Sequence, residues 1–135
     1  MKSILELPAE KDYYSKVLDF IDKQLEECGC TIKKQLQIEV AVEEIFVNIA
    51  SYAYNQEKGM VKIEFSFEED RAEITFIDNG ISYNPLLKED PDTTLSSQER
   101  QIGGLGIYVV KKTMDEVNYR NENGCNILTI VKQIK

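Results

Sequence analysis

Alternating apolar and polar residues predict the strands of this protein. Between Val61 and Phe67 every second residue is apolar, and the same alternation runs from Ala72 to Asp78. A strand that buries one face has this period of two. The polar stretch 68–70 between the two runs indicates a turn, so the two strands are expected to form a hairpin.

Three further strands complete the predicted sheet. Ser3–Leu7 is expected to form a short first strand. Residues 117–120 and 126–134 are expected to form the closing pair of strands. The Asn123-Gly124 dipeptide between them is typical of a two-residue hairpin turn, because both residues tolerate a positive φ.

Apolar residues at helical spacing predict three helices. The first runs from about Ala9 to Glu27, with Pro8 suited to its start and Gly29 suited to its end. The second runs from about Lys33 to Tyr54, and the third from Leu105 to Asp115. The apolar faces of the first two helices are expected to carry Tyr14, Val17, Leu18, Ile21 and Leu25, and Ile38, Ala41, Val42, Ile45, Ile49 and Tyr52.

These elements predict an α/β (α+β) two-layer sandwich. A mixed, mostly antiparallel sheet is expected to be covered on one face by about three helices. The chain of 135 residues has the length of one domain, so residues 1–135 are expected to form a single unit. From Asn84 to Gln101 the sequence is polar and long for a loop, which indicates a lid or a disordered segment.

The formal net charge of -8 argues against nucleic-acid binding, which needs clustered lysines and arginines. Acidity is a common route to solubility, and it would also attract a basic partner surface. No apolar run approaches the ~18 residues of a membrane span, and no charged and then apolar leader opens the sequence. We therefore expect a cytoplasmic protein that does not enter a membrane.

The sequence has three cysteines and lacks histidine, which limits the kinds of metal and catalytic site that it can form. Cys28, Cys30 and Cys125 form an odd set that does not predict a disulfide framework, and a zinc site would need thiolates alone and a fourth ligand. Idle or buried thiols are the expected state. Without histidine, a His-based triad and a phospho-accepting histidine are excluded, and so is a complete two-component sensor kinase on this chain.

Glu44 and Asn48 lie one helical turn apart and share a flank of the second predicted helix, whereas Glu43 points toward solvent. An amide oxygen from Asn48 can bind magnesium, which prefers oxygen ligands. The Glu44 carboxylate can act as a base toward an attacking hydroxyl. The alternative is an ordinary exposed glutamate and asparagine.

Two further motifs can contribute to a nucleotide site. Asp78 ends an apolar strand, where it can accept a hydrogen bond from an adenine amine, and Gly80 allows close approach of a flat ring. Gly103, Gly104, Leu105 and Gly106 open the last helix, whose amide-rich start suits phosphate oxygens. Taken singly, these are a turn and a helix start without a ligand. Arg100 can reach a terminal phosphate, or it is a surface arginine.

Taken together, the motifs resemble those of the GHKL (Bergerat-fold) ATPase superfamily, and more narrowly the RsbW-like anti-sigma factor serine/threonine kinases. The matching stretches are Glu44-Ile45-Phe46-Val47-Asn48, then Asp78-Asn79-Gly80 with Tyr83-Asn84-Pro85, and the run from Gly103 to Val110 with Met114-Asp115-Glu116-Val117. Sensor kinases favour a glycine where this sequence has Ser82, and relatives often have histidine where it has Tyr52.

The resemblance implies an ATP- and Mg-binding Bergerat-type sandwich. It implies Glu44 as the base, Asn48 as the metal ligand, Asp78 as the adenine reader, and the glycine turn as the phosphate site. It further implies a sigma factor held in check, an anti-anti-sigma (STAS-type) protein phosphorylated on Ser or Thr, and a homodimer. Two alternatives are a nucleotide-gated binding module without phosphotransfer, and a sensor-kinase fragment that works with a separate histidine domain.

Overall fold

Five strands form one sheet in the order β1-β2-β3-β5-β4, and each of its four pairings is antiparallel. A computed structural model describes residues 2–53, 59–87 and 104–134. The strands are β1 (Lys2–Pro8), β2 (Met60–Glu68), β3 (Arg71–Asp78), β4 (Glu116–Glu122) and β5 (Cys125–Gln133). The α-helices are α1 (Tyr14–Glu27), α2 (Ile32–Tyr52) and α3 (Gly104–Thr113), with short 3-10 turns η1 (Lys11–Tyr13) and η2 (Pro85–Leu87).

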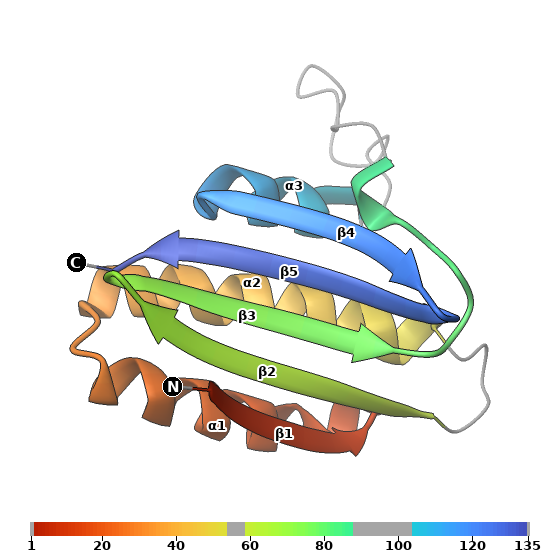
Figure 1. Ribbon diagram of the computed structural model, residues 1–135, viewed down its shortest axis with the longest axis horizontal. Helices are drawn as coiled ribbons and strands as arrows, with labels where there is room; N and C mark the ends of the chain where they lie inside the picture. The colour runs from red at the N-terminus through yellow and green to blue at the C-terminus, as the bar shows by residue number, and fades with distance from the viewer. Residues whose placement is uncertain (1, 54–58, 88–103, 135) are drawn as a thin grey trace.

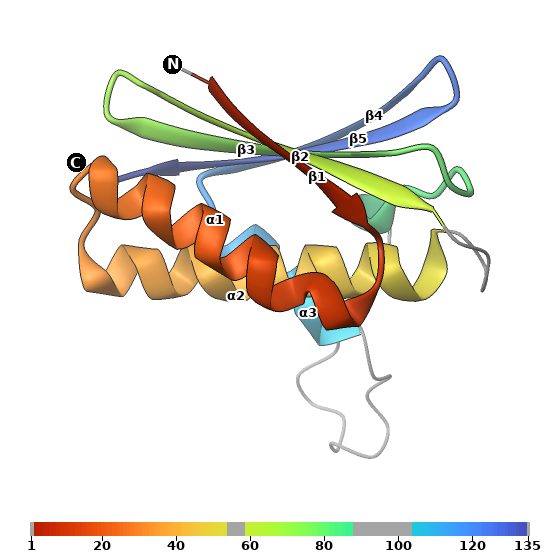
Figure 2. The ribbon, with the colours of Figure 1, turned by 90° about the horizontal axis from the view of Figure 1, so that it is seen from below.

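All three α-helices lie on one face of the sheet, and the other face is open (Figures 1 and 2). Figure 2 shows the twisted sheet edge-on above the helix layer, with α2 running beneath its length. The predicted two-layer sandwich, mostly antiparallel and covered on one face, is therefore confirmed. The sheet is more regular than expected, because no described strand pair is parallel.

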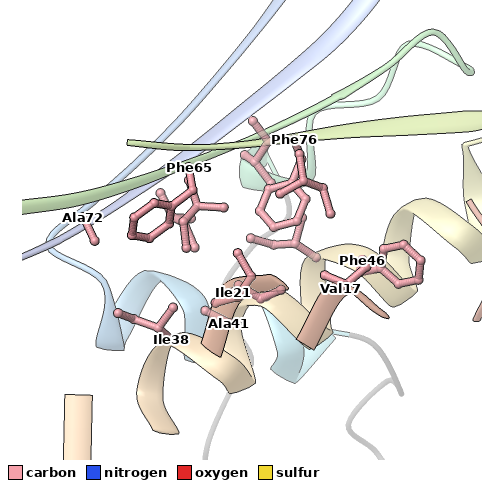
Figure 3. Close-up of a cluster of buried hydrophobic side chains, with 14 of the residues drawn as sticks. Val17, Ile21, Ile38, Ala41, Phe46, Phe65, Ala72 and Phe76 are labelled. Carbon is pink, nitrogen blue, oxygen red and sulfur yellow. The ribbon is translucent and has the colours of Figure 1, made fainter. Parts of the chain in front are cut away.

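The core lies between the helix layer and the inner face of the sheet. Figure 3 shows aromatic and aliphatic side chains of β2 and β3 meeting those of α1 and α2. Removing such a side chain from water stabilises the fold by about 1.5–3 kcal/mol. The fully buried members include Val17, Ile21, Ile38, Ala41, Val42, Phe46, Val61 and Ile63. The strand alternation and the helix spacing thus placed most of the core, but Leu18 is only half-buried and lies outside it, and Phe46 is an added member.

Both predicted hairpin turns have the backbone conformation that a two-residue loop requires. Glu69 and Asp70 have φ values of 53° and 64°, and Asn123 and Gly124 have values of 53° and 79°. Two consecutive residues with positive φ match the twist of antiparallel strands. These turns set the register of β2 on β3 and of β4 on β5.

The first helix begins later than its sequence pattern predicts. Pro8 pairs with Met60 as the last residue of β1, and the Ala9 amide donates to the Gly59 carbonyl at 2.9 Å. The helix α1 therefore starts at Tyr14, after η1, and not near Ala9. The predicted stop at Gly29 is confirmed.

Gly29 ends α1 in a paired hydrogen-bond motif. Its own amide donates to the Glu26 carbonyl, and the Cys30 amide donates to the Leu25 carbonyl, both at 3.1 Å. Because Gly29 has a φ of 77°, it adopts this left-handed conformation without a Cβ penalty. The chain then reverses into α2, whose first turn is capped by the Thr31 hydroxyl.

A pair of carboxyl groups lies where α1 packs against α2. The side chains of Asp22 and Glu39 share a hydrogen bond, and the Gln35 amide donates to Asp22 at 3.2 Å. The hydrogen bond with Asp22, followed by burial, raises the pKa of Glu39 from its usual 4.5 to about 7. The folded protein therefore holds a proton here that the unfolded chain releases at lower pH.

This proton makes stability depend on pH, with a sign set by the raised pKa. The contribution is present below pH 4.5 and is lost as pH rises through about 7, because the native state binds more protons than the unfolded chain. Glu39→Gln keeps the hydrogen-bonding shape without the charge. We expect thermal melts to show that the variant gains stability relative to the parent between pH 5 and pH 8 (roughly the range of this titration). Parallel melting curves across that range would contradict this assignment.

Candidate functional site

A pocket opens between the C-terminal half of α2, the end of β3 and the β4-β5 pair. It contains about 440 Å³ of empty space, including its opening to solvent. Its walls are largely apolar, with polar atoms gathered at one end. The lining residues are Ile45, Asn48, Ile49, Ala53, Phe76, Asp78, Ile81, Tyr83, Pro85, Tyr119, Asn126 and Leu128. An apolar cleft with a few convergent polar groups is suited to a flat aromatic ligand.

Asp78 is the buried acid of this pocket. Only 5% of its surface is exposed, although a carboxylate is costly to bury without partners. Its Oδ1 atom accepts hydrogen bonds from the Gly80 amide at 3.0 Å and from the Asn126 side-chain amide at 2.9 Å. Within the described part of the chain, Oδ2 has no such donor. That oxygen is available to accept a hydrogen bond from a ligand.

Asn126 is a site residue that the motif analysis missed. Its amide nitrogen donates to Asp78 Oδ1 and to the Ile81 carbonyl, both at 2.9 Å. Its oxygen accepts from the Tyr83 backbone amide and the Asn121 side chain, both at 3.3 Å, and from the Tyr119 hydroxyl. Asn126 thus ties the Asp78 carboxylate to the loop after β3 and to β4.

A signal for Asn126 was present in the sequence. It occupies an inward-facing position of a strand whose other inward residues, Leu128 and Ile130, are apolar. A buried polar side chain at such a position needs hydrogen-bonding partners, so it marks a polar network or a site. Its partners, however, come from segments distant in sequence.

Gly80 is needed for a reason other than the predicted approach to a flat ring. A Cβ atom here would lie 2.6 Å from the carbonyl carbon of Ala53 and 2.8 Å from its Cβ. The next amide, of Ile81, donates to the Ala53 carbonyl at 2.6 Å. The glycine therefore lets the loop after β3 pack on the C-terminal end of α2, and so forms one wall of the pocket. Its role in cofactor binding stays a prediction.

Glu44 and Asn48 lie on one flank of α2 as predicted, and both are half-buried, whereas Glu43 is exposed. Asn48 lines the pocket beside Asp78. Glu44 lies instead against α3, because a Cβ at Gly106 would clash with its Oε2 atom and lie 3.0 Å from its carboxyl carbon. The flank of α2 therefore connects the pocket to the glycine-rich start of α3.

The glycine turn is described only in part. Gly104 and Leu105 form the first turn of α3, and Gly106 follows them. The start of a helix presents unpaired amides and a partial positive charge, which suit phosphate oxygens. Gly103 and Arg100 lie outside the described residues, as does most of the polar segment from Asn84 to Gln101. Three of the four predicted turn residues thus open α3, and Gly106 among them lies against Glu44. Their contact with phosphate stays a prediction.

A second hollow lies on the open face of the sheet and is larger, with about 1090 Å³ of empty space. It is lined by side chains such as Glu64, Thr75, Asn118 and Thr129, and none of the predicted site residues that the structure describes lines it. We assign the ligand site to the smaller pocket because the buried acid and the α2 flank converge there.

A match to a family model is consistent with this geometry. The model, described as the histidine kinase-like ATPase domain, matches residues 7–132. The chain therefore belongs to the histidine kinase-like ATPase domain family.

Relatives refine this assignment. The serine-protein kinase RsbW of Bacillus velezensis is 30% identical over 130 residues, which cover 91% of this chain and 80% of the relative. The serine-protein kinase RsbW of Bacillus subtilis is 28% identical over 130 residues, with the same coverage. Within its family the chain belongs to the RsbW-like group of serine-protein kinases.

Solved structures agree on the fold. A Mycobacterium tuberculosis structure of RsbU and RsbW domains superposes with a TM-score of 0.69 at 16% identity, over 99% of this chain. The present chain spans about a third (32%) of that one. The catalytic domain of the histidine kinase ThkA gives a TM-score of 0.57 at 11% identity, covering 98% of this chain and 96% of that domain. Among the described residues, no helix is both long and apolar enough to cross a bilayer.

The role assigned to Gly80 predicts a steric cost for any side chain. We expect Gly80→Ala to destabilise the fold by about 1–3 kcal/mol, because the added methyl displaces the Ala53 backbone. Gly124→Ala is the matched control: its surroundings are open and its cost comes only from a φ of +79°, about 1 kcal/mol. Urea unfolding measures both variants. A smaller loss for Gly80→Ala than for Gly124→Ala would refute the packing argument.

Proposed function

We propose that this protein is an ATP- and magnesium-dependent serine/threonine kinase that works as an anti-sigma-type, partner-switching regulator. Its substrate is a Ser or Thr of an anti-anti-sigma (STAS-type) protein. One observation carries the proposal: a single flank of α2 places Asn48 in the Asp78 pocket and Glu44 against the start of α3. A base site, a metal ligand and a phosphate site are then neighbours.

The pocket fits an adenine ring. Its apolar walls suit the two faces of the ring, and the unused Oδ2 of Asp78 suits the exocyclic amine. Guanine carries a carbonyl in place of that amine, and a carbonyl cannot donate to a carboxylate. Asn126 holds the carboxylate in place from behind. Adenine is therefore favoured over guanine.

The phosphate and metal positions follow from the same flank. ATP supplies the phosphoryl group, and magnesium offsets the negative charge of the phosphates. Asn48 would bind the metal with its amide oxygen, and phosphate oxygens and waters would complete the ligand set, as is usual for magnesium. Gly103, Gly104, Leu105, Gly106 and Arg100 would contact the phosphates.

Glu44 would serve as the base. Its carboxylate is half-buried and lies against Gly106, where phosphates held by α3 would end. It would accept the proton of the acceptor hydroxyl as that oxygen forms its bond to phosphorus. Phosphoryl transfer needs mainly positioning and charge neutralisation, which these groups supply.

The partners follow from the RsbW-like group. A sigma factor would be held by this protein while the STAS-type protein is phosphorylated, because phosphorylation would prevent the STAS-type protein from competing for it. A homodimer in the cytoplasm would carry out both tasks. No part of this requires nucleic acid or membrane binding, in agreement with the net charge of -8.

Labelled ATP tests the kinase assignment. With magnesium and a STAS-type acceptor, we expect label on a Ser or Thr of the acceptor. Glu44→Ala should keep ATP affinity and lower the transfer rate by about 10²–10⁴-fold, because proton removal is lost. Initial rates and calorimetric titration with ATP separate the two effects.

Two companion variants sharpen this test. Glu27→Ala removes an exposed carboxylate at the end of α1 and should leave the rate unchanged. Gly106→Ala retains Glu44 but displaces its carboxylate, so it should slow transfer while hardly affecting stability. An unchanged rate in Glu44→Ala would remove Glu44 from the base role. ATP binding by the parent without any transfer would favour the nucleotide-gated binding module.

A second prediction concerns the buried acid. Asp78→Asn replaces one of the two acceptor oxygens with an NH2 group, which cannot accept a hydrogen bond from the adenine amine. We expect ATP affinity to fall by at least about tenfold, roughly the worth of one hydrogen bond to a charged group. Calorimetry measures the affinity, and thermal melting reports any loss of stability. Equal ATP affinity in parent and variant would show that the adenine assignment is wrong.

A further inference from the structure

The helix α2 carries a second apolar line in addition to the one that faces the core. Ile32, Leu36 and Val40 recur every four residues, so they lie along one side of the helix. They are 78%, 55% and 44% exposed. The core-facing residues of the same helix, such as Ile38 and Ile45, lie on the opposite side. Figure 2 shows this half of α2 at the outside of the helix layer, away from the sheet.

This outer line differs from the solvent-facing side of an ordinary amphipathic helix. A surface helix normally keeps its polar residues on the side opposite the core. A helix that is apolar on two sides normally buries both. Single exposed apolar residues need no explanation, but an aligned set indicates a surface that a partner covers.

Acidic groups border the line. Glu43 follows Val40 by one turn, and Glu39 lies on the flank toward α1, where it hydrogen bonds with Asp22. Burial raises the pKa of Tyr14 nearby to about 12, and three carboxyl groups add to this rise: Glu43, Glu39 and Asp22.

The carboxyl groups of this border have no cationic partner in the described ranges, where the ion pairs are Lys2–Glu64, Arg71–Glu116 and Arg120–Glu122. Lys33, exposed at the start of α2, precedes Leu36 by three residues and Val40 by seven, so it lies at the N-terminal end of the same line. The negative border therefore lies toward the C-terminal end of the line, around Glu43.

We propose that Ile32, Leu36 and Val40 dock an amphipathic helix of a partner protein whose apolar residues are flanked by arginine or lysine. The apolar side chains of the partner would cover the line, and its cations would pair with Glu43 and, above about pH 7, with the ionised Glu39. When a helix docks in this way, its apolar anchor residues recur at helical spacing. The charges would guide association and select against acidic helices.

A second copy of this chain is a poorer fit. It would bring its own Glu39 and Glu43 to the same interface, next to those of the first copy. Repulsion between like charges works against such pairing. The surface is carried by α2 alone, so the proposal is independent of phosphotransfer and extends beyond the kinase assignment.

Synthetic peptides test the occupant. One peptide of about 18 residues, long enough to form a helix on binding, carries leucines at helical spacing with arginines on one flank. A second replaces those arginines with glutamates. Fluorescence anisotropy against the full-length protein measures both. We expect the arginine peptide to bind at least about tenfold more tightly, a gain that weakens as salt screens the charges.

Matched variants locate the binding. Leu36→Gln should weaken the arginine peptide by at least about tenfold, as expected for a central apolar anchor. Ile4→Gln is the control, because Ile4 is also 55% exposed but lies on β1, outside the helix layer, and it should bind as the parent does. Glu39→Gln with Glu43→Gln should reduce the preference for arginine over glutamate. ATP affinity, measured on the same samples, should not change.

Several results would overturn the proposal. The arginine peptide could fail to bind the parent, the glutamate peptide could bind equally well, or the arginine peptide could bind Leu36→Gln as tightly as it binds the parent. Sedimentation supplies one more: a parent dimer that Leu36→Gln turns into a monomer would show that a second copy covers this line. Loss of ATP binding in a variant would concern the nucleotide site and not this surface.

Discussion

The burial of one carboxylate at the end of β3 constrains the whole functional end of the molecule. Asp78 is almost excluded from water, so its carboxylate is costly to bury without donors fixed in place. Gly80 and Asn126 provide two such donors to Oδ1, from the following loop and from β5. Asn126 in turn holds the Ile81 carbonyl and receives bonds from β4. The last two strands, the loop and the acid therefore form one hydrogen-bonded unit.

The helix α2 joins this unit to everything else. One side of it fills the core, and one flank carries Asn48 and Glu44 toward the pocket and α3. Its C-terminal end receives the loop after β3 through Ala53 and Gly80. Its outer side carries the exposed apolar line. A single rigid helix about 30 Å long thus contacts the core, the pocket and α3 on different sides, and displacing one side moves the others.

Two glycines set the close approaches that the site requires. At Gly80 the neighbour is backbone, which cannot move away, so the constraint is structural. At Gly106 the neighbour is the end of the Glu44 side chain, which can rotate, so the constraint acts on the position of a carboxylate. Both glycines belong to motifs that are predicted to contact the ligand. The structure shows that each also has a protein neighbour that a side chain would displace.

The sequence by itself determined the strands, the hairpin turns, the helix faces and the separation of Glu43 from Glu44. These follow from local periodicity and from the φ preferences of single residues, which act over a few positions. It also supplied Asp78, Asn48 and the glycine turn as candidates. The pattern misplaced the start of α1, because pairing of Pro8 with Met60 and of Ala9 with Gly59 is a long-range interaction.

Only the tertiary structure decided which groups meet. The five partners of the Asn126 side chain come from the end of β3, the loop after it, and β4. The contact between Gly106 and Glu44 joins two helices that are distant in the chain. Such contacts depend on the order of the strands in the sheet and on how the helices pack. The pattern of residues along the chain does not show which distant segments come close in the folded protein.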